Sequence, residues 1–447
     1  MNYNDFFKKA NEKNITNIQV VEKNVIDSSV EILDGEIESY DDYNNIDYDV
    51  KAEYNGKTVK LNSDYLDEDT LDLIIKKCEI TDSEYKDDYL NNNEKIKQNK
   101  ALEFNIKKEI DKLIKIDKLR EKYPDIKKLT TCFCENYTNT RIINSNGVDI
   151  STDSHLCTYI VEAITEKDGN FTSYDEKILT TNKEEIDFET FAENVIKKTL
   201  ILCNKKKIDS KKYNIILDRR VASRIISSFG QMLSATAIRN KVSCLENKLD
   251  KKLFSDKLTI IEDPTNKNYP GYRLFDNEGT RTYKKDIIKN GIVKTYLYNI
   301  KEAILAETKS TANGYGSIAT KNMYVIPGNI TDEDLIKKLD NGIYIADYME
   351  SGGTSINSVN GNISLQVFGF IVENGKLVSG IEPSILTSTI YELLSNIEEI
   401  SSNLQFTSTS SACPSMLIKD ISIARWQTKY IFRLKSCITL FFWYNKF

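Results

Sequence analysis

Apolar and polar residues alternate most regularly along residues 363–370 of this chain. Ile363, Leu365 and Val367 occupy every second position, with polar or aromatic residues between them. A period of two predicts a β-strand with one face in a core. Asn360-Gly361 precedes this strand and Asn374-Gly375 follows it, and both dipeptides are typical of tight turns. The stretch therefore predicts two or three strands of an antiparallel sheet, with a further glycine turn at 352–353.

Residues 1–88 show shorter alternating stretches separated by turn signals. Asp34-Gly35 and Asn55-Gly56 are hairpin-turn dipeptides. A helical repeat follows over 67–77, with its apolar residues on one face. The pattern predicts strands at 18–22, 29–33, 36–40 and 46–54, and then this helix.

Residues 89–210 read as a second mixed module behind a polar, Asn-rich linker at 84–100. A charged helix is predicted over 101–122, with an apolar stripe that begins at Leu102, and an amphipathic helix over 188–203. Strands are predicted between these helices at 128–136, 140–143, 158–165 and 174–180.

Residues 211–424 form the largest predicted domain. Asp218 is a suitable N-cap between a strand and a long helix predicted over 219–239. A second helix is predicted over 388–400, and strands are predicted at 213–217, 322–326 and 416–424. The fold class is therefore α+β, with two small N-terminal α/β modules (1–88 and 89–210). The C-terminal domain (211–424) is dominated by antiparallel sheet with flanking helices, and an atypical tail (425–447) follows it.

The charge pattern argues against nucleic-acid and membrane partners. Lys and Arg number 61 against 67 Asp and Glu, a net charge of −6, and no basic tract occurs. No run reaches the roughly 18 apolar residues of a membrane span. Residues 1–14 lack the apolar core of a signal peptide. These features predict a cytoplasmic protein with reduced cysteines.

Histidine and cysteine limit the possible catalytic chemistry. His155 is the single histidine and is placed near a turn, with a structural role favoured over a catalytic one. A two-histidine zinc site is therefore impossible within this chain. Cys132 and Cys134 flank Phe133 on a predicted strand, so their thiols point the same way and are expected to be half-buried. Cys413 precedes a proline and has no histidine near it in sequence, so a structural role is favoured there too.

Two acidic groups are candidates for acid–base chemistry. Glu262-Asp263 follows a predicted strand, and 332–334 begins a predicted helix with Thr331 as its N-cap. Carboxylates at such positions are usually solvated. We therefore assign no catalytic, cofactor-binding or metal-binding residue in this chain from its sequence.

Several segments in order resemble the TldD/PmbA family of metalloproteases, the former modulators of DNA gyrase, and within it the TldE (PmbA) branch. They are Leu258–Pro264 (LTIIEDP), Phe275–Thr282 (FDNEGTRT), the Lys289–Ile292 turn (KNGI) and the GGTS, NGN and ENGK segments between 352 and 376. The resemblance is clear from about Tyr213 to Ala424. It implies a cytosolic dimer in which a zinc-bearing TldD chain cuts unfolded peptide in a shared cavity, with antitoxins and peptide-antibiotic precursors among the family's substrates.

The zinc motif of the TldD branch, HExxxH, is absent from this sequence. Its position by resemblance falls near 228–233, within 225–237, which reads IISSFGQMLSATA and contains no His, Asp, Glu or Cys. The resemblance therefore implies a TldE-like noncatalytic subunit with no cofactor of its own, and zinc is expected in a TldD-type partner. That partner forms a heterodimer with this chain; a homodimer is the other possibility.

Two other functions stay open on the sequence. The chain can be a stand-alone peptide-binding protein, or a metal-free protease that uses His155 or Cys413. The last function requires a nucleophile beside His155. The tail at 425–447 does not resemble the family's end. It can be an added strand, a partner-docking segment or the product of a shifted reading frame.

Overall fold

The computed structural model describes residues 1–80, 106–349 and 355–426, and every structural statement below concerns these residues. The glycine turn predicted at 352–353, the linker predicted at 84–100 and the tail after Trp426 lie outside them. Leu102, at the start of the predicted helix, also lies outside them.

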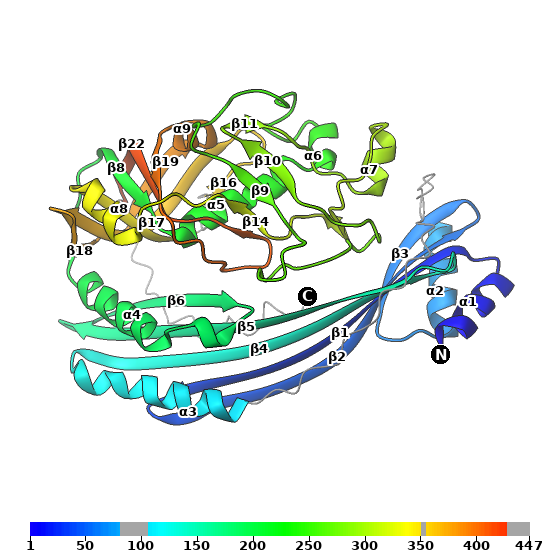
Figure 1. Ribbon diagram of the computed structural model, residues 1–447, viewed down its shortest axis with the longest axis horizontal. Coiled ribbons are helices and arrows are strands. Elements are labelled where there is room, and N and C mark those ends of the chain that lie inside the picture. The colour runs from blue at the N-terminus through cyan, green and yellow to red at the C-terminus, as the bar shows by residue number, and fades with distance from the viewer. Residues whose placement is uncertain (81–105, 350–354, 427–447) are drawn as a thin grey trace.

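A long antiparallel sheet of six strands runs along the lower part of the molecule (Figure 1). Its strands are β1 (Thr16–Leu33), β2 (Glu36–Tyr54), β3 (Lys57–Ser63), β4 (Ile126–Asn144), β5 (Asp149–Lys167) and β6 (Asn170–Thr180). Their order across the sheet is β3-β2-β1-β4-β5-β6. The predicted strands are confirmed, but three pairs each belong to one continuous strand: 18–22/29–33 to β1, 36–40/46–54 to β2 and 128–136/140–143 to β4.

Helices cover this sheet in two places. They are α1 (Tyr3–Glu12), α2 (Glu68–Ile80), α3 (Ile106–Asp117), the 3₁₀ turns η1 (Lys118–Lys122) and η2 (Lys183–Glu185), and α4 (Phe188–Leu202). At one end α1 and α2 close a small core with the ends of β1, β2 and β3. Further along, α3 and α4 share a core with β4 and β5. In this core the centre of the Tyr159 ring lies 4.9 Å from that of Phe133 and 4.8 Å from that of Phe188.

The first two predicted modules contribute to the same sheet. β1 is hydrogen-bonded to β2 on one side and to β4 on the other, so the three strands from 1–88 and the three from 89–210 join at the β1–β4 pair into one continuous sheet. The division into modules stays a prediction. Val30 and Ile32 of β1 belong to the core that α3 and α4 share with β4 and β5, whereas α1, α2 and the other ends of β1–β3 keep a small core of their own.

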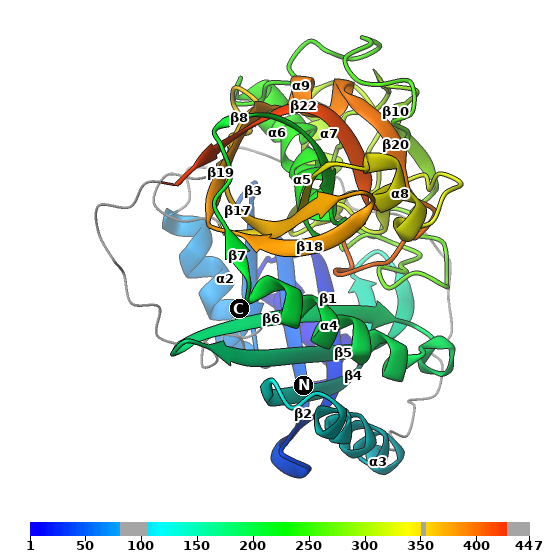
Figure 2. The same ribbon diagram turned by 90° about the vertical axis from the view of Figure 1, so that its left-hand side faces the viewer.

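The C-terminal lobe packs over the β6 edge of the long sheet (Figure 1). Its nine-stranded sheet contains β7 (Lys205–Lys206), β8 (Lys211–Leu217), β15 (Gly342–Met349), β16 (Ser355–Ile356), β17 (Asn362–Glu373), β18 (Lys376–Ile381), β19 (Ser384–Thr389), β20 (Ile397–Ile400) and β22 (Met416–Arg425). Five of them, β15-β8-β22-β19-β17, close into a ring because β15 also pairs with β17 (Figure 2).

Smaller sheets and five helices complete the lobe. The five-stranded sheet is β11-β10-β9-β14-β21, and β12 pairs with β13. These strands are β9 (Ile260–Glu262), β10 (Lys285–Lys289), β11 (Ile292–Val293), β12 (Gly314–Tyr315), β13 (Ser317–Ile318), β14 (Met323–Val325) and β21 (Ser411–Ala412). The helices are α5 (Arg219–Met232), α6 (Ala235–Arg239), α7 (Ile300–Leu305), α8 (Asp332–Leu339) and α9 (Ile390–Ser395). The mixed α+β class is confirmed.

The alternating stretch at 363–370 is confirmed as part of β17. Ile363, Leu365 and Val367 are buried at 0–1% exposure and face the core around α5. The predicted turn follows at Asn374-Gly375, where the chain reverses into β18. No helix in the described part of the chain is long and apolar enough to cross a membrane.

Two helix predictions were wrong in length. The helix predicted over 219–239 ends at Met232 because Ser234 takes an extended conformation and bridges to Leu297. The helix predicted over 388–400 is only α9, since Ile397 to Ile400 form β20 against β22. In both cases pairing with a strand distant in sequence overrides the local apolar spacing.

Candidate functional site

A cleft of about 870 Å³ opens between α5 and the end of the long sheet. We call it the α5 cleft. Its walls come from α5, α6, α7, β13, the residues after β13, and β3. The lining residues are Thr58, Lys60, Ser227, Gly230, Gln231, Ser234, Thr236, Ala237, Arg239, Asn240, Val242, Asn299, Lys301, Glu302, Gly316, Ser317, Ile318, Ala319, Thr320 and Ser410. The cleft is thus built by segments from both ends of the chain.

One face of α5 forms a wall of the cleft. Ser227, Gly230 and Gln231 are three and four residues apart, so they lie on the same side of the helix. Phe229, just before Gly230, and Met232, just after Gln231, are fully buried in the core. Of residues 228–233, only Gly230 and Gln231 therefore line the cleft. Gly230 has no side chain, so the Gln231 amide is the one functional group that this stretch presents there.

Apart from one carboxylate, the polar groups that line the cleft are hydroxyls, amides and cations. Among the described lining residues Glu302 is the single side chain of the kind that binds zinc. Arg239 holds it through two bonds of 2.8 and 2.9 Å, and that hydrogen bond lowers the pKa of Glu302 despite partial burial. Zinc sites use three or four protein ligands, so the Glu302 carboxylate, which is already paired with Arg239, cannot form one alone.

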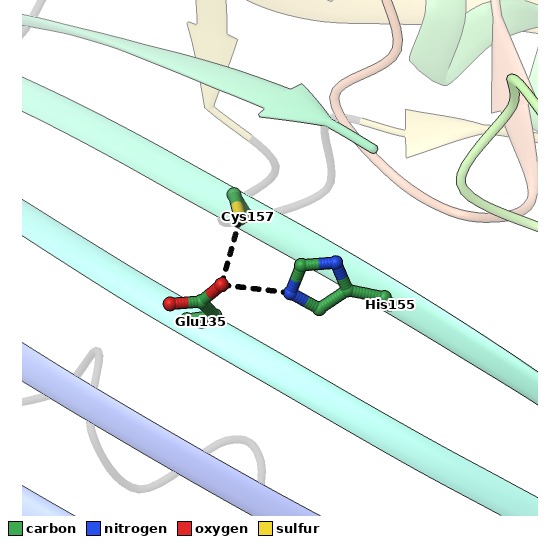
Figure 3. Close-up of side chains that lie close together, drawn as sticks. All are labelled: Glu135, His155 and Cys157. Carbon is green, nitrogen blue, oxygen red and sulfur yellow. Dashed lines mark hydrogen bonds and ion pairs between the residues drawn. The ribbon is translucent and has the colours of Figure 1, made fainter. Parts of the chain in front are cut away.

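A second cluster lies on β4 and β5, where Glu135, His155 and Cys157 converge (Figure 3). The His155 Nε2 lies 2.8 Å from the Glu135 Oε1, and the Cys157 thiol lies 3.8 Å from the same oxygen. Burial acts to raise the pKa of Glu135, but His155 and Lys183 outweigh it and the pKa is lowered. The prediction that His155 lies near a turn was wrong, because it sits inside β5 opposite Tyr137.

The metal-free protease required a nucleophile beside His155, and Cys157 occupies that place. Its exposure is 0%, and burial, followed by the charge of Glu135, raises the pKa of its thiol to about 12. Nucleophilic cysteines need a populated thiolate and access to substrate. Cys157 has neither, so this pair does not support thiol catalysis.

Cys413, Cys132 and Cys134 are also unsuited to act as nucleophiles. Cys413 is fully buried, and burial raises the pKa of its thiol well above the ordinary value. Cys132 and Cys134 are half-buried on β4, as predicted. Burial raises the pKa of the Cys132 thiol to about 12.

The expectation that Glu262-Asp263 is solvated was wrong. Glu262 has 0% exposure and accepts hydrogen bonds from Lys285 (2.8 Å) and from Asn313 (2.9 Å). Asp263 is 9% exposed. Lys285 and Asn313 are 23 and 51 residues from Glu262, so the residues around Glu262 in the sequence do not indicate that it is buried and paired. By contrast, Thr331 caps α8 as predicted, and Glu333 and Asp334 are exposed.

An ionic network positions the start of α5, and the sequence did not indicate it. The Glu176 carboxylate on β6 lies 2.5 Å from the Lys198 Nζ on α4 and 2.9 Å from Arg219 Nη2 at the first residue of α5. Arg220 donates to the Tyr174 hydroxyl (2.9 Å) and to the Ala346 carbonyl (3.1 Å). The network thus connects α5, which lines the α5 cleft, to β6 of the long sheet.

Profiles of known protein families match most of the chain. The PmbA/TldA metallopeptidase C-terminal domain matches residues 210–425, and the central domain of the same metallopeptidases matches residues 99–202.

Curated relatives are named as metalloproteases. A PmbA homolog of Buchnera aphidicola is 31% identical over 236 residues, which are 53% of this chain and 51% of that protein. A TldD homolog of the same organism is 27% identical over 241 residues, 52% of this chain and 49% of that protein. Escherichia coli PmbA is 25% identical over 228 residues, 51% of this chain and 49% of that protein. The chain therefore spans about half the length of the curated relatives it matches.

Solved structures share the fold over nearly the whole chain. A Thermotoga maritima protein described as a modulator of a DNA gyrase superimposes with a TM-score of 0.82 at 22% identity, over 94% of this chain and 99% of its own. TldE from Thermococcus kodakarensis gives a TM-score of 0.80 at 18% identity, with 94% and 99% coverage. At such identities the likeness concerns the fold.

Proposed function

We propose, from the premise that this chain belongs to the PmbA/TldD metallopeptidase family, that it is the noncatalytic subunit of a TldD-type metalloprotease. In this role it completes the cavity of a dimer and holds unfolded peptide against zinc bound by a TldD-type partner. A cytoplasmic location is part of the proposal, since the described cysteines are free thiols, which a reducing compartment maintains.

The α5 wall of the cleft is the observation that carries this proposal. The resemblance places the HExxxH motif of the TldD branch near 228–233, and there the cleft is lined by Gly230 and Gln231, with Ser227 directly before them. Hydroxyls and amides can hydrogen-bond a peptide backbone, but they neither bind zinc as neutral imidazoles do nor act as a base near neutral pH. The cleft is thus suited to holding a chain rather than cutting it.

An open sheet edge supports the peptide-holding role. β2 pairs with β3 only from Tyr48 to Tyr54, so among the described strands its residues 36–47 have a neighbour, β1, on one side alone. Four large side chains of this segment are 40–51% exposed: Ile37, Tyr40, Tyr43 and Ile46. Unpaired edges of this kind accept extended peptides as an added strand.

The test is to mix this chain with a TldD-type chain that contains HExxxH. Cleavage of an unfolded peptide is followed by mass spectrometry for each chain alone and for the mixture. We expect cleavage only in the mixture, together with a heterodimer by light scattering. Cleavage by this chain alone, or none on mixing, contradicts the proposal. Peptide binding without any cleavage favours the stand-alone binding protein instead.

Filling the α5 cleft tests whether it holds the substrate. Gln231 is exposed on the α5 wall, so Gln231→Trp places a large ring in the cleft without disturbing the core. We expect cleavage by the mixed subunits to fall on the order of tenfold or more, because small displacements of a bound chain are costly. The measurement is the initial cleavage rate at fixed peptide concentration.

The matched control is Glu333→Trp. Glu333 is exposed on α8, at the opposite end of the C-terminal lobe from α6 and α7 (Figure 1). This variant should cleave at the unmodified rate. Equal rates for both variants would show that the α5 cleft does not hold the substrate.

A further inference from the structure

The Glu135, His155 and Cys157 side chains meet because of strand register. His155 and Cys157 are two residues apart on β5, so both side chains point to the same face of the sheet. Glu135 on β4 lies directly opposite Cys157 in the antiparallel pairing. Three different donor atoms, a ring nitrogen, a thiol sulfur and a carboxylate oxygen, therefore lie within 4.8 Å of one another (Figure 3).

We propose that these three residues form a site for one Zn²⁺ ion, separate from the α5 cleft. Zinc takes imidazole, thiolate and carboxylate ligands, and three protein ligands with one water is a common arrangement. Bond lengths of about 2.0–2.3 Å put tetrahedral ligand atoms about 3.3–3.8 Å apart. Two pairs are at 2.8 Å (His155 to Glu135) and 3.8 Å (Cys157 to Glu135), and the third, His155 to Cys157, is within 4.8 Å, so side-chain rotations that move each atom by about 1 Å suffice. The Cys157 thiol proton leaves to solvent when zinc binds.

The rigidity and access of the site favour this assignment. Both strands continue well beyond the cluster on each side, so the three Cα positions are fixed before any ion arrives. The Glu135 side chain is 5% exposed, whereas His155 is 27% exposed and provides the route from solvent. The fourth position of the ion would thus be reached from the His155 side.

Lys183 is the competing cation at this cluster. Its Nζ lies 3.3 and 3.4 Å from the two Glu135 oxygens. A second buried carboxylate, Glu109 on α3, lies 3.7 Å from the same ammonium. Lys183 can therefore turn to Glu109 and keep an anionic partner when zinc takes Glu135. If the cluster is a zinc site, removal of Lys183 should strengthen zinc binding. If the cluster is only an ionic network that stabilises the fold, the same change should lower the free energy of unfolding and have no effect on zinc.

The experiment uses the full chain, stripped with a chelator and then dialysed against Zn²⁺ or Co²⁺ at equal concentrations of metal and protein. We expect about one metal per chain, and for Co²⁺ a near-ultraviolet thiolate-to-cobalt absorption band. Cys157→Ser should abolish that band, and His155→Gln should weaken binding at least tenfold. Lys183→Met should bind zinc several-fold more tightly.

Cys413→Ser is the matched control, because it removes a buried thiol that belongs to no group of three potential metal ligands among the described residues. It should leave metal content and spectrum unchanged. If the unmodified chain takes up no metal, or gives a Co²⁺ spectrum without the thiolate band, the proposal is wrong. This outcome does not depend on whether the variants fold. Because the readout is metal binding and not cleavage, its failure leaves the noncatalytic-subunit proposal intact.

Discussion

Gly291→Ala should lower the free energy of unfolding by about 2–5 kcal/mol. Gly291 is in the hairpin between β10 and β11 with φ of +75°, a left-handed conformation that costs other residues about 1–2 kcal/mol. An added Cβ would also lie 2.1 Å from the Phe254 carbonyl oxygen and 2.7 Å from that of Ser255. Both are backbone atoms, so the chain must shift, which typically costs a further 1–3 kcal/mol.

The control for this prediction is Gly56→Ala. Gly56 has nearly the same φ, +76°, but nothing lies within 4 Å of its added Cβ. Only the conformational cost then applies, and we expect a loss of about 1–2 kcal/mol. Urea unfolding of both variants measures the difference. Equal losses would mean that the close approach of Phe254 to this turn does not exist in solution.

Glu176→Gln should be about as destabilising, at roughly 3–5 kcal/mol near neutral pH, because it leaves the largely buried Lys198 and Arg219 cations, whose side chains are 21% and 14% exposed, without their anion. Glu176 is 4% exposed and contacts both Lys198 and Arg219. Burial acts to raise the pKa of this carboxyl, but the charges of Lys198, Arg219 and Arg220 outweigh it and hold the pKa well below the ordinary value.

The same pKa shift determines how this loss depends on pH. A carboxyl with a lowered pKa in the folded state stabilises the fold fully above its unfolded pKa of about 4.3, and that stabilisation is lost as pH falls below it. The gap between wild type and Glu176→Gln should therefore be constant from pH 6 to 8 and narrow below about pH 4.3. Urea unfolding across this range measures it, and a gap that widens on acidification contradicts the assignment.

Glu193→Gln is the control for charge removal on the same part of the molecule. Glu193 lies on α4 and pairs with Lys197 at 3.2 Å, but both side chains are partly exposed, at 28% and 55%. Solvated pairs of this kind contribute under about 1 kcal/mol. Similar losses for both variants would indicate that Glu176 is solvated rather than buried between the two lobes.

Local patterns in the sequence determined most of the elements. The alternation at 363–370 predicted β17, and the Asp218 cap predicted where α5 begins, since both signals lie within a few residues of the structure they specify. Short-range turn chemistry likewise placed the β1–β2 hairpin at Asp34-Gly35. The motifs between 258 and 376 also indicated the family, which the profile matches confirm.

Contacts between distant segments decided the rest. Ser234 leaves the helix because Leu297, more than sixty residues later, bridges to it. Glu262 is buried because Lys285 and Asn313 come to it.

The α5 cleft and the two buried clusters depend on such contacts as well. The cleft combines α5 with Lys60 from β3. Glu135 faces Cys157 only through the register of β4 on β5. Periodicity and turn signals act over a few residues, so the sequence by itself determined the elements and the family of this protein. Which polar side chains are buried together depends on strand pairing and packing across the whole chain, and this only the tertiary structure decided.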